Sequence, residues 1–119
     1  MSVPSHCSLM KPAAEKLAER LAWTRIEAPR IPVVHNASVE NASDPEQIRT
    51  LLIMQLYSPV RWVETVCSKG EQGIEFLVDA GPGKVLAGLN RRIDKSMQVL
   101  PVFDPDSLSK ALEETQGVE

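Results

Sequence analysis

The sequence predicts a small α/β protein, with a short, mainly parallel three-stranded sheet flanked by helices. Its 119 residues suffice for one domain at most. Its hydrophobic fraction of 43% is close to the ordinary globular level. Apolar runs of strand length alternate with stretches of helical periodicity, and strands separated by helices need the crossover connections that join parallel strands.

The first predicted elements are an amphipathic helix over residues 10–21 and a strand over residues 31–35. Apolar residues of the helix recur at alternating spacings of four and three, which places them on one face. They are Met10, Ala14, Leu17 and Leu21. Residues 31–35 form a short apolar run that predicts a buried strand, with Pro32 near its start.

Asp44 begins the second predicted helix, and three local features agree on this start. Asp44 can cap the helix, Pro45 suits its first position, and Gln47 occupies the position of a capping-box partner. The helix is expected to end before Pro59. Its expected buried positions are Ile48, Leu51, Leu52 and Leu56. A further helix is predicted over residues 60–69, ending at Gly70 and burying Val63, Val66 and Cys67.

The C-terminal half alternates strands and helices. Strands are predicted over residues 74–78 and 99–103, and Pro101 favours an edge position for the second. The segment between them contains the turn Gly81-Pro82-Gly83 and a helix marked by Val85, Leu86, Leu89 and Ile93. Asp104-Pro105-Asp106 opens a last helix that carries Leu108, Ala111 and Leu112. Gly83-Lys84 lacks the spacing of a phosphate loop, so a tight turn is the preferred interpretation.

Composition excludes several classes of function. The formal net charge of −3 argues against a generic nucleic-acid binder. No apolar run approaches the ~18 residues of a membrane span, so no membrane association is expected. Cys7 and Cys67 cannot supply several disulfides or a Cys-rich zinc site, and His35 has no second histidine at ligand spacing. We therefore expect no metal, no cofactor and a reducing, cytoplasmic compartment.

Two polar residues stand out as candidates for chemistry. Gln55 continues the apolar stripe of Ile48 and Leu52, and a buried amide without partners costs about 1–3 kcal/mol. It is either a structural glutamine bonded to a loop or part of a site. His6 precedes the first helix behind the stiff Pro4, and histidine is the commonest general base. On position alone, however, a histidine near a terminus more often has no role.

Other combinations of reactive residues are less favourable. Cys7 and Ser5 adjoin His6, and neighbouring side chains of an extended segment point to opposite sides, so neither makes a dyad with it. The Gly-x-Ser-x-Gly pattern that exposes a nucleophilic serine is absent. Arg91 and Arg92, with nearby lysines, form a basic helix face that is either simply solvated or docks an acidic partner.

Three motifs occur in an order and at a spacing that resemble a known family. They are Pro4-Ser5-His6-Cys7-Ser8-Leu9-Met10, Gln55-Leu56-Tyr57-Ser58-Pro59-Val60-Arg61-Trp62 and Gly81-Pro82-Gly83-Lys84-Val85-Leu86. Together they resemble the C-terminal portion of the malonyl-CoA:acyl carrier protein transacylases of bacterial type II fatty-acid synthesis. Acyltransferase domains of polyketide synthases are similar but more distant. The resemblance covers essentially the whole chain.

This resemblance implies a fold and a set of roles. Residues 1–119 would be the C-terminal segment of an α/β-hydrolase-like subdomain. His6 would be the base of a Ser–His dyad, and the main-chain carbonyl of Gln55 would fix the tautomer of its ring. The implied reaction is malonyl transfer from malonyl-CoA to the pantetheine thiol of acyl carrier protein.

Several features of the family have no counterpart in this sequence. They are the Gly-His-Ser-Leu-Gly nucleophile segment, the Gly-Gln-Gly oxyanion loop, the arginine that pairs with the malonyl carboxylate, and the ferredoxin-like subdomain. We therefore expect an incomplete fold that is inactive alone and that either joins the missing N-terminal part or self-associates. The alternatives are a truncated inactive fragment or a non-catalytic module that binds acyl carrier protein through Arg91 and Arg92.

Overall fold

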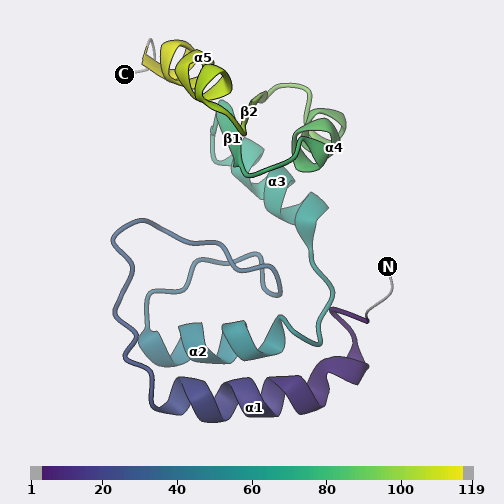
Figure 1. Cartoon of the computed structure of the whole chain (residues 1–119), viewed down its shortest axis with the longest axis vertical. Coiled ribbons are helices and arrows are strands. Elements are labelled where there is room, and N and C mark those ends of the chain that lie inside the picture. Colours follow the sequence, from purple (N-terminus) through teal and green to yellow (C-terminus); the bar gives the residue numbers. More distant parts are fainter. Residues whose placement is uncertain (1–3, 117–119) are drawn as a thin grey trace. The chain divides into compact units, whose positions relative to one another are not determined.

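The computed structural model describes residues 4–116, which form two compact units (Figure 1). The division between the units falls after Thr65, inside a helix. The elements in chain order are a 3-10 turn (Ser8–Met10), α1 (Lys11–Ala22), α2 (Pro45–Met54), α3 (Trp62–Glu71), β1 (Phe76–Ala80), α4 (Val85–Ile93), β2 (Gln98–Val102) and α5 (Pro105–Gln116). No helix of the described part is long and apolar enough to cross a bilayer, and both cysteines are free.

The first unit is built on α1 and α2, which lie side by side (Figure 1). Ala14 of α1 and Leu51 of α2 are buried. The start of α2 confirms the capping prediction, because the Gln47 N–H donates to the Asp44 carboxylate at 3.1 Å. The end of α2 at Met54 agrees with a stop before Pro59.

The predicted strand over residues 31–35 is wrong in the described structure. This segment contributes only an isolated antiparallel bridge between Val34 and Asn41. The chain turns back on itself at once: the His35 N–H donates to the Glu40 carbonyl at 3.2 Å, and the Val39 N–H donates to the His35 carbonyl at 3.0 Å. Pro32 also has no N–H to give to a neighbouring strand. A β-strand needs a neighbouring strand to pair with, whereas Val34 pairs with Asn41 in the segment that directly follows.

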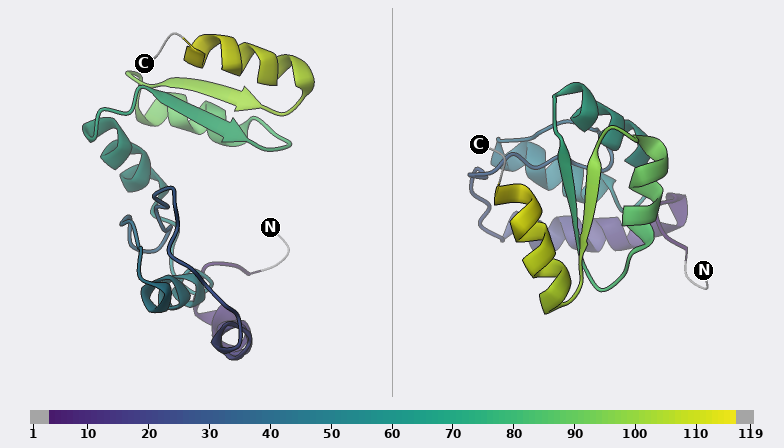
Figure 2. Two further views of the ribbon diagram at one scale, coloured as in Figure 1. Left: turned by 90° about the vertical axis from the view of Figure 1, so that its left-hand side faces the viewer. Right: turned by 90° about the horizontal axis from the view of Figure 1, so that it is seen from above.

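The second unit contains two parallel strands joined by a crossover through α4. Their register runs from Phe76 opposite Gln98 to Ala80 opposite Val102. The two strands lie between α4 and α5 (Figure 2, left). Asp79 accepts the Ala87 N–H of α4 at 3.0 Å, and Gln98, whose side chain points to the other face, donates to Glu114 of α5 at 3.0 Å. The parallel α/β prediction is thus confirmed, with two strands in place of three.

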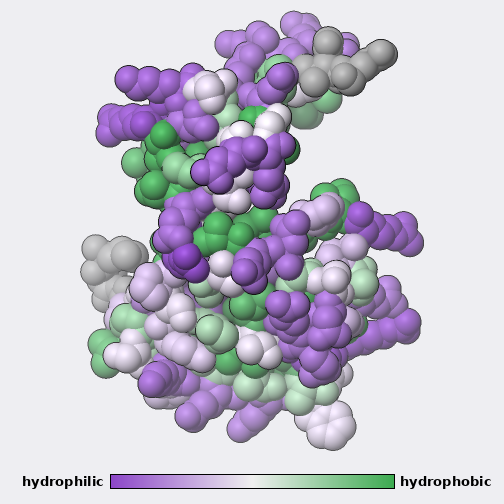
Figure 3. All heavy atoms as spheres, turned by 180° about the vertical axis from the view of Figure 1, so that it is seen from behind, coloured by the Kyte–Doolittle hydropathy of each residue, from purple (hydrophilic) through white to green (hydrophobic). Residues whose placement is uncertain are grey.

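The sequence predicted the apolar faces of the helices, but it did not predict which of their residues are buried. Val66, Ala87, Val99, Leu100 and Ala111 form much of the core. Val63 and Cys67, which were expected to be buried, are exposed instead. Most of the apolar residues that marked the last two helices are exposed too: Val85, Leu86, Leu89, Leu108 and Leu112. Green hydrophobic residues accordingly reach the surface in Figure 3. Two strands offer each helix only a narrow surface, so small residues make the contact and larger apolar ones stay uncovered.

The end of α3 also differs from the prediction. The helix continues past Gly70 to Glu71. Gly73 adopts a left-handed φ of 83°, and the Ile74 N–H behind it donates to the Lys69 carbonyl at 3.1 Å. Gly73 is therefore the glycine that ends the helix, because its missing Cβ allows that conformation.

Candidate functional site: a histidine held by a main-chain carbonyl

The first unit brings His6 and Gln55 together, although they are 49 residues apart. The His6 Nδ1 lies 2.9 Å from the Gln55 carbonyl oxygen. His6 stands just before the 3-10 turn that leads into α1, and Gln55 is the C-cap of α2. Packing α1 against α2 therefore places a ring at one helix start against a carbonyl at the other helix end. His6 is exposed and Gln55 is half-buried.

This contact determines which ring nitrogen carries the proton. A carbonyl oxygen can only accept a hydrogen bond, so Nδ1 must be the donor. In the neutral ring, Nε2 then keeps its lone pair and can accept a proton. The geometry is that of an oriented base. The catalytic roles of His6 and Gln55 stay predictions.

The backbone at His6 is in an uncommon conformation. Its φ is 53°, in the left-handed region, which histidine enters more often than most residues. This conformation costs on the order of 1–2 kcal/mol for a residue with a Cβ. Cys7, by contrast, is extended with φ −145°, and its carbonyl accepts the Met10 N–H at 3.0 Å to begin the 3-10 turn. The left-handed conformation of His6 therefore changes the direction of the chain just before the 3-10 turn begins.

Arg49 connects α1 to α2, and sequence reasoning missed it. Its Nε donates to the Leu21 carbonyl at 3.1 Å and its Nη2 to the Thr24 carbonyl at 2.8 Å, while Nη1 pairs with Glu46. Its side chain is only 20% exposed. These carbonyls lie at the C-terminal end of α1, where the helix dipole also favours a cation. The sequence signal was modest: a basic residue three positions after Glu46 on a helix.

A cavity of about 300 Å³ lies between α1 and α2, but it does not include the histidine contact. It is lined by Lys11, Ala14, Glu15, Ala18, Ile53 and Tyr57. The Lys11 ammonium lies 6.0 Å from the centre of the Tyr57 ring at its rim. Within residues 4–116, no group of three or more His, Cys, Asp or Glu side chains is arranged to hold a metal ion.

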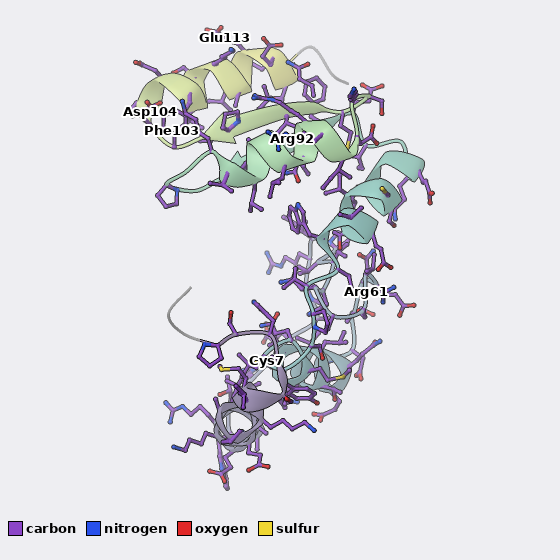
Figure 4. The ribbon with its side chains drawn as sticks, turned by 90° about the vertical axis from the view of Figure 1, so that its right-hand side faces the viewer. Cys7, Arg61, Arg92, Phe103, Asp104 and Glu113 are labelled. Carbon is purple, nitrogen blue, oxygen red and sulfur yellow. The ribbon has the colours of Figure 1, made fainter. Side chains whose placement is uncertain are left out.

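The two arginines that were predicted to bind a partner, Arg91 and Arg92, are neighbours on α4 of the second unit. Arg91 reaches along the sheet, and its Nη2 donates to the Val99 carbonyl at 3.3 Å. Both arginines are exposed, and Arg92 is the next residue of α4 (labelled in Figure 4). Partner binding by these residues stays a prediction.

Local contacts surround one cation, Lys84, and two acids, Asp104 and Glu64. The Lys84 ammonium stacks 4.4 Å from the centre of the Phe103 ring. Hydrogen bonds from Ser107 lower the pKa of Asp104 below its ordinary 3.8, with a smaller contribution from the charge of Lys84. In the α3 region, the hydrogen bond from Arg61 lowers the pKa of Glu64.

The fold and site together define a class: a mixed α/β chain with an oriented histidine ahead of its first helix. Comparison with known proteins shows which family the chain is similar to. The chain is 48% identical over 112 residues to the malonyl CoA-acyl carrier protein transacylase of Salmonella typhimurium, and 49% identical over 114 residues to that of Haemophilus influenzae. These matches cover 94% and 96% of the chain and 36% of each relative. No protein-family model matches the chain.

Solved structures agree with the sequence relatives. An acyl carrier protein S-malonyltransferase from Vibrio cholerae is 51% identical, with a TM-score of 0.90 over 93% of this chain and 36% of that one. A malonyl-transacylase solved in complex with a type II PKS acyl-carrier protein is 49% identical, with a TM-score of 0.92 over 96% and 37%. The chain is thus similar to the C-terminal portion of these transacylases and spans about a third of their length.

Proposed function

We propose that this chain contributes the histidine of a site that transfers a malonyl group from malonyl-CoA to the pantetheine thiol of acyl carrier protein. His6 is the general base and acid, and the Gln55 carbonyl orients its ring. The observation that carries the proposal is the 2.9 Å contact between Nδ1 and that carbonyl. The names of the relatives support the reaction and both substrates.

In this proposal the nucleophile is a serine from outside these 119 residues, because they contain no Gly-x-Ser-x-Gly segment. The serine oxygen attacks the malonyl thioester while the His6 Nε2 takes its proton. The C–S bond breaks, and the imidazolium returns that proton to the departing CoA thiolate. The pantetheine thiol then gives its proton to His6, attacks the malonyl-serine ester and releases the serine, which regains the proton. No step requires a metal or a cofactor.

The chain alone is therefore expected to be inactive, since a base without its nucleophile has no covalent route. The test incubates the purified chain with labelled malonyl-CoA and acyl carrier protein and follows the label on the carrier. The expected transfer equals that of the His6→Ala variant. Transfer near the rate of a complete transacylase would contradict this division of residues between the chain and the rest of the site.

The oriented ring can be tested without any activity. Nitrogen-15 spectroscopy distinguishes the two neutral tautomers of His6, whose signals are assigned by their loss in His6→Gln. We expect the Nδ1–H form, because the Gln55 carbonyl can only accept. Gln55→Met should leave this tautomer unchanged, since it preserves the main-chain oxygen. A dominant Nε2–H form in the unaltered chain would remove the basis of the assignment.

A second candidate function is a non-catalytic module that binds acyl carrier protein through Arg91 and Arg92. The solved complex of a related transacylase with an acyl-carrier protein supports the carrier as a partner, and both arginines are exposed. Arg92→Glu should weaken carrier binding and reduce its salt dependence. Arg91→Glu should do so as well, but it also removes the bond to Val99. Unchanged affinity and salt dependence in both variants would exclude this surface.

A further inference from the structure

A further cavity, of about 240 Å³, lies in the second unit along β2 and between α4 and α5. Its walls include Val99 and Leu100 of β2, which are buried. Its charged lining residues are Lys84, Arg91 and Lys110, and no acidic residue lines it in the described part of the chain. Apolar walls that carry charges of one sign concentrate ions of the opposite sign. Because the whole chain has a formal net charge of −3, this positive charge is a local property of the cavity.

Two of these cations are held near opposite ends of the cavity. The Lys84 ammonium packs 4.4 Å from the centre of the Phe103 ring, and the Arg91 Nη2 donates to the Val99 carbonyl at 3.3 Å. Val99 and Phe103 are four residues apart, which corresponds to about 13 Å of extended chain. The contact with Val99 uses one of the five N–H donors of the guanidinium. Since Lys110 adds a third cation from α5, the positive charge extends along the cavity and is not confined to one point.

The acidic residue Asp104 follows Phe103 at the turn from β2 into α5 (both labelled in Figure 4). Hydrogen bonds from Ser107 and, more weakly, the charge of Lys84 lower the pKa of Asp104. Its carboxylate accepts the Ser107 N–H at 2.7 Å, and it does not line the cavity. Within residues 4–116, none of the three basic side chains of the lining forms an ion pair. The cavity therefore keeps an excess of positive charge, and an anion between these cations would offset their mutual repulsion.

We propose that this cavity binds an elongated anion made of two or three linked phosphate groups. Arginine and lysine are the side chains that recognise phosphate, arginine through its planar fork and lysine as a point charge. A single phosphate is too short to contact cations that are anchored at Val99 and Phe103, about 13 Å apart along the chain. A row of phosphate groups can contact both of them and Lys110. The anion is either a free oligophosphate or the diphosphate of a larger ligand such as coenzyme A, and the inference does not depend on the proposed reaction.

Titration calorimetry of the full chain with tripolyphosphate tests the site at about 0.15 M salt, where attraction between exposed charges is screened beyond about 8 Å. We expect one anion per chain, bound at least about tenfold more tightly than inorganic phosphate or the compact tricarboxylate citrate. Lys110→Gln and Lys84→Met should each weaken binding by about fivefold or more, because each removes one cation from the lining. The methionine keeps an apolar side chain against Phe103. Lys95→Gln is the matched control and should leave the affinity unchanged, since Lys95 is an exposed lysine of the same unit that does not line the cavity.

Coenzyme A is then added as a competitor to identify the source of the phosphate groups. Displacement of tripolyphosphate assigns them to a ligand of the coenzyme A kind, and no displacement assigns them to a free oligophosphate; both results support the site. The inference is overturned if tripolyphosphate does not bind, or if phosphate or citrate binds equally well. It is also overturned if Lys95→Gln weakens binding as much as Lys110→Gln, because diffuse attraction would then account for the binding. Acyl carrier protein that binds through Lys84 and Lys110, with no binding of tripolyphosphate, would replace the anion site with a carrier surface.

Discussion

Removing the Arg49 side chain should loosen the packing of α1 against α2 and, with it, the orientation of His6. The Arg49 guanidinium joins α2 to the C-terminal end of α1 through the main-chain carbonyls of Leu21 and Thr24, and it also forms an ion pair with Glu46 within α2. Arg49→Ala leaves both carbonyls without this donor. Arg49→Lys keeps the charge but not the planar fork, so it can replace only part of the set.

The expected loss follows from these contacts. A hydrogen bond to a charged group contributes about 1.5–3 kcal/mol when shielded from water. Two such bonds at a side chain that is 20% exposed, reduced for partial hydration, give roughly 2–4 kcal/mol for Arg49→Ala. Arg49→Lys should lose about half of that. The matched control is Arg25→Ala, because the Arg25–Glu27 pair is exposed on both sides, and such pairs contribute about 0–1 kcal/mol.

Amide hydrogen exchange along α1 and α2 measures the free energy of opening of this unit without involving the sheet. The same samples give the tautomer of His6 by nitrogen-15 spectroscopy. We expect Arg49→Ala to lower the opening free energy and to mix the tautomers. If the opening free energy of Arg49→Ala lies within about 0.5 kcal/mol of that of Arg25→Ala, the Arg49 contacts do not stabilise the packing of α1 against α2. A loss of stability with an unchanged tautomer would show that these contacts do not control the orientation of His6.

Variants at three further residues test local features. Asp44→Ala should lower the stability of α2 by about 1 kcal/mol in hydrogen exchange, because it removes the cap on the Gln47 N–H, and Asp44→Asn should retain most of it. Val66→Ala should cost about 2 kcal/mol in urea unfolding, from two lost carbons of a 1% exposed side chain and the cavity they leave. The pKa of Asp104 is lower in the folded state than its ordinary 3.8, so its carboxylate stabilises the fold above that pH and the effect is lost as pH falls through the folded value. Asp104→Asn should therefore be less stable to urea than the unaltered chain at pH 7, and the two free energies of unfolding should converge in acid. A constant difference across that range would mean that the ionised carboxylate is not the source of the stabilisation.

Local chemistry was readable from the sequence wherever one segment determines its own structure. The start of α2 is such a case, because Asp44, Pro45 and Gln47 act on the same helix end. Residues 31–35 are the opposite case. Their apolar run is compatible with a strand, but pairing is a property of two segments, and the nearest partner turned out to be residue 41.

Burial failed for a related reason. The apolar stripe of α4 was visible, yet Ala87 and Asn90 are the buried residues of this helix, whereas Val85 is 75% exposed. A stripe shows which side of a helix prefers to be covered, not how much surface is available to cover it. A sheet of two strands is narrow, so only the helix residues that lie closest to it are buried. The three-dimensional fold determines which residues these are.

The sequence singled out His6 and Gln55, which the structure brings into contact, although part of the argument for Gln55 was wrong. An amide on an apolar stripe drew attention to this position, but the observed bond uses the main-chain oxygen, which every amino acid possesses. The part that sequence can specify is the placement of that oxygen. Because Gln55 is the C-cap of α2, its carbonyl belongs to the last turn, where carbonyls lack partners within the helix and accept from outside. His6 supplies such a donor from a left-handed turn. The free carbonyl at the helix end and the ring nitrogen therefore satisfy each other, which is how an imidazole can be oriented without an acidic residue.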